Sequence, residues 1–254
     1  MIGRNKTLEL KNMGKQSLTF DITFPVYNEK RQLEESVLKM IGFCNANKIS
    51  EFVITIADNG SIDGTSEIAK RLEQEHQVVR YIKIDQKGVG AALKKAWLSS
   101  SCDILGTMDI DLSTDLRHFK EVYNRFQTNN VDLIVGSRLL DGSVVIGRSL
   151  VREITSRGFN KILSKLLKIG FTDGMCGFKF IKKEVFDKLM LIGIQNNEWF
   201  FETELLVKAE RNSFEILEIP VCWEDDRDSK VNLIPLSLRY LKEIGRLRKE
   251  LKKR

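Results

Sequence analysis

The carboxylates Asp109 and Asp111 are the residues whose type and spacing most directly imply chemistry. They lie in "ILGTMDIDLSTD", where an apolar run typical of a buried strand gives way to polar residues. Two like charges this close destabilise each other unless a cation neutralises them. Mg²⁺ and Mn²⁺ prefer such hard oxygen ligands, and phosphate oxygens and water usually complete the coordination. A bare D-x-D is common, so its meaning depends on what lies beside it.

A second polar cluster, "PVYNE", follows the apolar run "LTFDITF". It contains Pro25, Tyr27, Asn28 and Glu29, and a helical pattern begins directly after it. A strand that ends in polar residues where a helix begins forms part of the rim of an open α/β sheet, where ligands bind. We therefore expect this segment to contact a ligand.

The segment "ADNGSIDGT" follows the next apolar strand. Asp58 ends that strand, Gly60 permits a turn with positive φ, and Ser61 or Asp63 can cap the following helix. Taken alone, a capped turn is favoured over a binding site by roughly two to one. However, Asp58 is expected at the same rim, where its carboxylate can accept hydrogen bonds from a nucleobase or a ribose.

Lys87 precedes a helix in "QKGVGAALKKAW". The two glycines do not make a dinucleotide-binding fingerprint, because the third small residue and the acidic residue further along are missing. A lysine near a helix N-terminus can still hold phosphate charge. A glycine turn with a solvated lysine is an equally good interpretation of this segment by itself.

These motifs require a sheet that places strand ends side by side. Apolar strand patterns alternate with helical periodicity, which predicts an α/β fold with a mostly parallel central sheet and helices on both faces. The expected strands are 18–25, 51–57, 78–84, 103–110, 131–137, 176–181 and 215–223. The expected helices are 30–47, 66–76, 88–100, 114–127, 148–168, 199–212 and an amphipathic C-terminal helix.

The 254 residues suffice for one large domain. We predict a flexible segment over 1–17, a single domain over 18–232 whose halves meet near 140, and a basic tail over 233–254. The tail from Arg239 holds eight Lys/Arg and two Asp/Glu, so the formal net charge of +6 belongs to it alone. A neutral body with a basic tail favours a local surface contact over nucleic-acid binding.

Several classes of protein are disfavoured by the same composition. The four cysteines are too widely spaced for a zinc or redox motif, so free thiols in a reducing compartment are expected. No N-terminal signal peptide and no apolar run long enough to span a bilayer is visible. We expect a protein that is soluble or peripheral.

In order, "PVYNE", "DNGSIDGT" and "DID" resemble the motifs of family-two glycosyltransferases of the GT-A type. In the C-terminal half, "GSR", "VREITSRGFN", "DGMCGFKF", "FETELL" and "EIPVCWEDDRDSKV" are similar to the polyprenyl-phosphate branch, which contains the dolichyl-phosphate mannose and glucose synthases. The resemblance covers about residues 19–231. It implies a GT-A nucleotide-sugar fold and an inverting transfer of a hexose from a UDP-glucose-like or GDP-mannose-like donor to a polyprenyl phosphate.

The resemblance also implies roles for particular residues. Asp109 and Asp111 would bind Mg²⁺ or Mn²⁺ and the donor diphosphate. Arg138 and Arg152, with Arg157 in reserve, would hold the acceptor phosphate, although a solvated helix face remains the alternative for Arg148, Arg152 and Arg157. The implied donor-binding residues are Pro25, Tyr27, Asn28, Glu29, Asp58, Asn59, Ser61, Lys87, Asp109, Ile110, Asp111 and Lys230.

Four positions depart from the family pattern. Ser113 replaces the Gln that the mannose synthases usually carry as a further metal ligand, and this resembles the glucose-transferring relatives. Gly174 and Met175 replace a usual Thr-Gln, and Asn59 replaces an Asp, a common variant. These departures leave the sugar, the base and the acceptor open.

The acceptor decides whether a catalytic base is needed. A lipid phosphate is already an anion at neutral pH, whereas a sugar hydroxyl requires a carboxylate base. The candidates are Asp173, Glu202 and Glu204. The rival functions are transfer to a glycan or surface polysaccharide, and an inactive subunit that recruits partners to membranes. A nucleotidyltransferase would need a glycine-rich loop after the first strand, which "PVYNE" is not.

The pattern of apolar and basic residues in the tail predicts contact with a membrane. Its apolar residues recur at gaps of three or four, which forms one stripe, with Lys and Arg on the other face. The members of the stripe are Ile234, Leu238, Leu241, Ile244, Leu247 and Leu251. Docking to an anionic membrane surface on the cytoplasmic face, directly or beside a separate anchoring subunit, competes evenly with a core-packed helix whose basic side is solvated.

Overall fold

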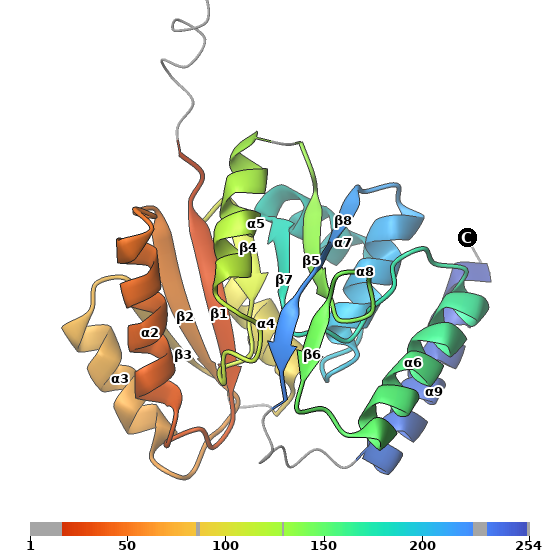
Figure 1. The fold of residues 1–254 in the computed structure, drawn as a ribbon, viewed down its shortest axis with the longest axis horizontal. Helices are drawn as coiled ribbons and strands as arrows, with labels where there is room; N and C mark the ends of the chain where they lie inside the picture. The colour runs from red at the N-terminus through yellow and green to blue at the C-terminus, as the bar shows by residue number, and fades with distance from the viewer. Residues whose placement is uncertain (1–16, 85–86, 129, 226–232, 253–254) are drawn as a thin grey trace, which may run out of the picture.

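Seven strands form the central sheet of the protein, which was studied as a computed structural model (Figure 1). The structure describes residues 17–84, 87–128, 130–225 and 233–252. The strands of this sheet are β1 (Phe20–Val26), β2 (Phe52–Asp58), β3 (Val79–Lys83), β4 (Ile104–Thr107), β5 (Leu133–Ser137), β7 (Lys179–Lys182) and β8 (Ile216–Pro220). The predicted flexible segment lies almost wholly outside the described residues.

The strand order is β3-β2-β1-β4-β7-β5-β8. Six of these strands run parallel, and β7 lies antiparallel between β4 and β5. A separate pair of strands, β6 (Val144–Ile146) and β9 (Cys222–Glu224), forms a small parallel sheet. The predicted mostly parallel sheet is therefore confirmed.

Two hydrophobic cores lie on opposite faces of the sheet. One contains buried side chains of α2 (Leu33–Ala46), α3 (Thr65–Glu75) and α5 (Arg117–Thr128). The other contains those of α4 (Val89–Leu98), α6 (Leu150–Leu167), α7 (Lys183–Ile192), α8 (Phe201–Arg211) and α9 (Leu233–Lys252). Helices thus cover both faces, as predicted for a GT-A type fold.

Two expected strands end earlier than predicted. The segment 215–223 is divided, because Pro220 lacks the N–H that would extend the ladder, and the chain continues as β9 in the small sheet. The segment 103–110 leaves the sheet after Thr107. It then turns so that Leu112, with φ of 54°, donates its N–H to the carbonyl of Asp109 at 3.0 Å. The two carboxylates of the D-x-D therefore lie on a turn rather than on a strand.

The C-terminal helix α9 packs along α6, and both helices begin at the same end of the molecule (Figure 1). Tyr240, Ile244 and Leu247 are buried against the second core, and the Tyr240 ring lies 5.1 Å from that of Phe159, centroid to centroid. Part of the predicted apolar stripe thus serves the core. No helix within the described ranges is long and apolar enough to cross a membrane.

Candidate active site

The polar motifs meet at the carboxyl ends of three neighbouring strands. β1 pairs with β2 on one side and β4 on the other, and Val26 at the end of β1 lies opposite Asp58 at the end of β2. Because the three strands are parallel, their loops leave the sheet at one edge. The segments around Tyr27, Asp58 and Asp109 therefore form one rim.

Hydrogen bonds join the loops that follow β1 and β2. Asn28, with φ of 59°, accepts a hydrogen bond from the N–H of Ile62 at 2.9 Å, and its own N–H donates to Ser61 Oγ at 2.9 Å. The N–H of Glu29 donates to the hydroxyl of Thr65 at 2.9 Å. The side chains of Asn28 and Ser61 thus shape the rim from within the protein.

Asp58 is a buried carboxylate with three internal donors. It accepts hydrogen bonds from the N–H of Ser61 at 2.8 Å, from the Ser66 hydroxyl at 2.6 Å and from the Tyr81 hydroxyl at 3.0 Å. Burial alone would raise its pKa, but these hydrogen bonds outweigh burial and lower it. Asp58 is therefore an anion held by three donors of the protein, buried directly beneath the rim.

Lys87 supplies positive charge at the same rim. Its Nζ donates to the Tyr27 hydroxyl at 3.0 Å and lies 4.8 Å from the centroid of the Tyr27 ring. The side chain of Asn59 accepts a hydrogen bond from the N–H of Gly88 at 2.7 Å, which ties the lysine loop to the end of β2. An exposed cation beside an exposed aromatic ring suits an anionic ligand that carries a flat base.

Asp109 and Asp111 form an acidic centre next to this rim. Asp109 lies against Gly177, where a Cβ would overlap its carboxylate, and Asp111 accepts a hydrogen bond from the N–H of Ser113 at 2.9 Å. Burial, with Asp111 and Glu202 adding to it, raises the pKa of Asp109 to about 7. Ile110 between them is buried in the first core, so only its backbone can reach a ligand.

Glu204 was a candidate base, and the structure corrects that prediction. It is buried and contacts Lys208 at 2.8 Å and Arg246 at 2.8 Å, so it joins α8 to α9. Burial would raise its pKa, but its hydrogen bonds and the two cations lower it. Glu202 differs, because its side chain is 12% exposed beside Asp109 and its one described ion pair, with Lys179, is 3.3 Å long.

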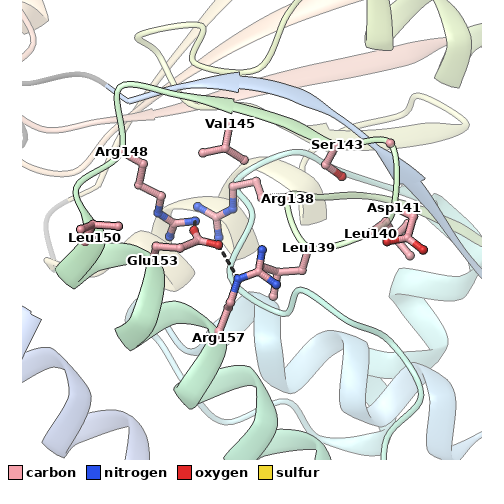
Figure 2. A pocket seen from close by; sticks show the side chains of 11 residues that line it. Arg138, Leu139, Leu140, Asp141, Ser143, Val145, Arg148, Leu150, Glu153 and Arg157 are labelled. Atoms are coloured by element: carbon pink, nitrogen blue, oxygen red, sulfur yellow. Dashed lines mark hydrogen bonds and ion pairs between the residues drawn. The ribbon is translucent and has the colours of Figure 1, made fainter.

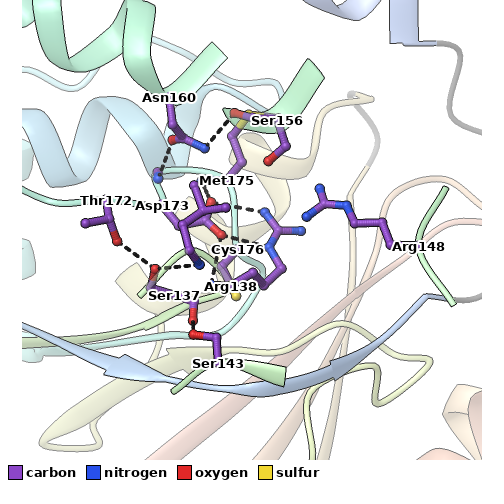
Figure 3. A network of polar contacts seen from close by, with 12 residues as sticks. Ser137, Arg138, Ser143, Arg148, Ser156, Asn160, Thr172, Asp173, Met175 and Cys176 are labelled. Atoms are coloured by element: carbon purple, nitrogen blue, oxygen red, sulfur yellow. Dashed lines mark hydrogen bonds and ion pairs between the residues drawn. The ribbon is translucent and has the colours of Figure 1, made fainter. Parts of the chain in front are cut away.

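Asp173, the third candidate base, is paired with Arg138 (Figure 3). Nε and Nη2 of Arg138 donate to its two oxygens at 2.7 and 3.0 Å. Although burial opposes ionisation, the guanidinium lowers the pKa of Asp173 to about 2. Such a carboxylate does not accept a proton at neutral pH, so Asp173 orients Arg138 instead.

A cavity of about 410 Å³ opens beside this pair (Figure 2). Three arginines line it, Arg138 from the end of β5, Arg148 from the segment after β6, and Arg157 from α6. The other lining residues are Leu139, Leu140, Asp141, Gly142, Ser143, Val145, Leu150 and Glu153. The concentration of guanidinium groups favours an anionic ligand.

Arg148 is more buried than its place in a predicted helix indicated. The helix begins at Leu150 rather than 148, so Arg148 precedes it and turns inward, and its side chain is only 10% exposed. Its guanidinium lies 5.6 Å from the centroid of the Trp223 ring. The guanidinium of Arg138 lies 5.3 Å from the same centroid. Within the described part of the chain, Arg148 Nε and Trp223 Nε1 have no hydrogen-bond partner. Burial and the charge of Arg138 lower the pKa of Arg148, although Arg148 also contacts Glu153 at 3.3 Å.

Of the other predicted acceptor residues, Arg157 lines the cavity and Arg152 does not. Arg152 contacts Asp225 at 2.7 Å, and Arg157, 61% exposed, contacts Glu153 on its own helix. Lys230 lies outside the described residues. The sequence could have singled out Arg148, because Gly147 before it and the cap residue Ser149 after it indicate a turn rather than a helix face.

The arrangement can hold two anions side by side. Asp173 pairs with Arg138, and Gly177, four residues further on, lies against Asp109, so the arginine cavity adjoins the acidic centre. Among the described residues, no three His, Cys, Asp or Glu gather closely enough to bind a metal ion by themselves. Two carboxylates at the rim therefore fit a cation whose remaining ligands come from a phosphate-bearing ligand and water.

Residues 21–190 match the family described as Glycosyl transferase family 2. Glycosyltransferase AglD of Haloferax volcanii is 34% identical over 215 residues, which are 84% of this chain and 34% of that protein. The chain thus spans about a third of the length of that curated relative. A dolichyl-phosphate beta-glucosyltransferase of Dictyostelium discoideum is 27% identical over 244 residues, 91% of this chain and 74% of that protein.

Among solved structures, the chain is similar to glucosyl-3-phosphoglycerate synthase from Mycobacterium tuberculosis in complex with Mn²⁺, UDP-glucose and phosphoglyceric acid. The TM-score is 0.67 at 17% identity, and the match covers 91% of this chain and 79% of that one. At this identity the similarity establishes the fold.

Proposed function

The chain belongs to glycosyl transferase family 2, and from this we propose that it transfers a hexose from a nucleotide sugar to a polyprenyl phosphate of the dolichyl type. The observation that carries the proposal is the adjacency of two unlike sites. The acidic centre at Asp109 and Asp111 borders the cavity that contains Arg138 and Arg148. A donor diphosphate and an acceptor phosphate need such a pair of neighbouring sites.

The donor nucleotide binds along the rim formed by β1 and β2. Tyr27 offers an exposed ring for the base, Asp58 accepts hydrogen bonds from the base or ribose, and Lys87 faces the diphosphate. The relative from Dictyostelium is named for glucosyl transfer to dolichyl phosphate, and Ser113 agrees with a glucose donor. UDP-glucose is therefore the first donor to test, with GDP-mannose as the alternative.

Asp109 and Asp111 are the residues that would hold a divalent cation. Their fit rests on the donor set, two hard carboxylates, and on the raised pKa of Asp109, to which burial and the charge of Asp111 contribute. When bound, the cation supplies positive charge that stabilises the leaving diphosphate. Mn²⁺ is present in the structure of the mycobacterial relative, so Mn²⁺ and Mg²⁺ are both proposed.

The acceptor phosphate binds in the arginine cavity. Arg138, oriented by Asp173, and Arg148, stacked on Trp223, face the phosphate, and Arg157 adds charge from the cavity lining. One phosphate oxygen attacks C1 of the sugar as the bond from C1 to the donor diphosphate breaks on the opposite face, so the configuration inverts. The nucleophile is already an anion, and no proton has to be removed.

A hydroxyl acceptor on a glycan is the second candidate, and Glu202 is the observation that favours it. Of the three carboxylates weighed as bases, Glu202 alone is not tightly held within the protein, and it lies beside Asp109. With a hydroxyl acceptor, Glu202→Gln should reduce turnover by about 10²–10⁴-fold. With a phosphate acceptor it should leave the rate within about tenfold of wild type.

The direct test combines the purified protein with UDP-glucose, GDP-mannose and other nucleotide sugars, Mg²⁺ or Mn²⁺, and a polyprenyl phosphate, with the product identified by mass.

Asp109→Asn and Asp111→Asn should each reduce turnover by at least about 10²-fold and weaken metal-dependent nucleotide binding. Asp187→Asn, in an exposed ion pair on α7, is the matched control. Turnover within a few-fold of wild type in both variants would contradict the assignment of the metal site.

A further inference from the structure

The outer face of α6 exposes an unusual number of apolar side chains. Val151 is 68% and Ile154 is 71% exposed, and Leu150 and Ile162 are exposed as well. Val151, Ile154 and Ile162 follow the helical repeat, so they form a stripe on the side opposite the buried Phe159 and Leu163. The first turns of this helix also supply Leu150, Glu153 and Arg157 to the arginine cavity.

The neighbouring helix α9 continues this exposed apolar surface. Leu238, 64% exposed, and Leu241 point away from the core, whereas Tyr240, Ile244 and Leu247 point into it. The two helices contact each other and begin at the same end of the molecule (Figure 1). Exposed apolar side chains therefore gather on the N-terminal halves of both helices, next to the cavity.

On the same two helices, most of the basic side chains are more exposed than the acidic ones. Every charged side chain that is exposed, within the described part of α6 and α9, is a lysine or arginine. These are Arg157, Lys161 and Lys165 on α6 and Arg239, Lys242, Arg248, Lys249 and Lys252 on α9. The acidic residues Glu153, Glu243 and Glu250 are each less exposed and contact an arginine or lysine of the protein.

Apolar residues surrounded by cations and free of exposed acids fit an anionic lipid surface. The apolar side chains can enter the boundary between headgroups and acyl chains, while Lys and Arg contact the headgroups. A second copy of the chain fits poorly, because a symmetric contact would bring two cationic faces together. The charge pattern therefore distinguishes a lipid surface from self-association.

We infer that the outer faces of α6 and the N-terminal half of α9 dock onto an anionic bilayer and bring the mouth of the arginine cavity to the lipid surface. This inference rests on the proposed lipid acceptor, since it lets a phosphate enter the cavity while its hydrocarbon chain stays in the bilayer. It differs from docking by the tail alone, because α6 supplies the larger share of the exposed apolar residues and because Ile244 and Leu247 of the α9 stripe are buried.

The test is co-sedimentation of the full chain with vesicles of phosphatidylcholine containing 0, 15 or 30% phosphatidylglycerol, at low and physiological salt. The apolar variant is Val151→Ser with Ile154→Ser and Leu241→Ser. The charge variant is Lys161→Gln with Lys165→Gln and Lys242→Gln. The controls are Leu191→Ser on α7, which replaces an even more exposed leucine, and the triple variant Lys70→Gln, Lys120→Gln and Lys188→Gln, which removes three exposed charges elsewhere.

Wild type and both controls should bind in proportion to anionic lipid and lose binding as salt rises, and the two test variants should bind about tenfold less or weaker still. Binding that ignores lipid charge and salt, or that is equal in the test variants and wild type, would overturn the inference. The inference would also be overturned by a dimer, measured by light scattering, that the apolar variant dissociates.

The variants should keep wild-type turnover with a water-soluble short-chain polyprenyl phosphate. Loss of vesicle binding with retained turnover separates docking from the proposed function.

Discussion

At the scale of single residues, Arg148 and Arg157 show how surroundings decide a role. They lie nine positions apart and both line the cavity, but Arg157 is mostly solvated and held by Glu153 on its own helix. Arg148 also contacts Glu153, at 3.3 Å, but it is nearly buried, stacks on Trp223, and leaves Nε without a partner among the described residues. A buried donor without an acceptor is costly, so a bound anion would gain most from Arg148.

We expect Arg148→Gln to raise the KM for a polyprenyl phosphate by about 10-fold or more, because a charge-assisted hydrogen bond contributes about 1.5–3 kcal/mol. Arg157→Gln should change it by less than about threefold, since an exposed charge is screened by solvent. Steady-state kinetics against acceptor concentration measures both, with Arg125→Gln, in an exposed pair on α5, as the control. Nucleotide affinity should stay unchanged in calorimetry. If it falls instead, Arg148 serves the donor.

At the scale of elements, the loop between α6 and β7 connects the two sites. Asp173 in its middle pairs with Arg138 at the end of β5, and Gly177 near its end lies against Asp109 after β4. The antiparallel β7 lies between β4 and β5, so this short loop reaches both strand ends. The Asp173–Arg138 pair therefore supports the fold as well as the cavity.

Asp173→Asn should destabilise the protein by roughly 3–5 kcal/mol at pH 7, because Arg138 would stay buried without its counter-charge. The pKa of Asp173 falls from an ordinary value of 3.8 to about 2 in the folded protein. Its stabilising contribution is therefore complete above about pH 4 and is lost as the pH falls toward 2, a difference of roughly 2 kcal/mol. Urea unfolding at pH 7, 4 and 3 measures both effects.

The control for this measurement is Asp187→Asn, whose exposed pair should matter little. The variant Asp173→Asn should lose less stability than wild type between pH 4 and 3, since it lacks one titrating carboxylate. Parallel pH dependences in wild type and Asp173→Asn would show that the pair does not hold Asp173 ionised in the folded state.

At the scale of the whole molecule, α9 is part of the domain. Tyr240, Ile244 and Leu247 complete the second core, and Arg246 contacts the buried Glu204 at 2.8 Å. Glu204 in turn accepts a hydrogen bond from the N–H of Asn196 at 2.9 Å, in the loop that contacts the N-terminus of α4 beside Lys87. The tail thus supports the donor side of the site through packing.

A version that ends at Asn232 should be strongly destabilised rather than merely unable to dock. Burial of a large apolar side chain contributes about 1.5–3 kcal/mol, so loss of these three contacts removes roughly 5 kcal/mol, comparable with the stability of many domains. Thermal unfolding followed by circular dichroism measures this, against a version that ends at Lys252. A cooperative transition at the wild-type temperature would contradict the packed role of α9.

The sequence by itself determined the sheet, its mostly parallel order and the donor rim. Alternating apolar strands and amphipathic helices are local patterns, and parallel strands carry the residues at their carboxyl ends to one edge. The segments of Tyr27, Asp58 and Asp109 could therefore be placed together from their positions in the chain. The family followed from the order of the same motifs.

Only the tertiary structure decided which charges are free. Asp173 and Glu204 look like candidate bases in the sequence, but their partners, Arg138 and Arg246, lie 35 and 42 positions away. Arg148 looks like a helix-surface residue until Trp223, far along the chain, covers it. Likewise, periodicity shows that α9 is amphipathic but not which neighbour covers its apolar side. Burial and ion pairing depend on contacts between distant segments, which local sequence patterns do not encode.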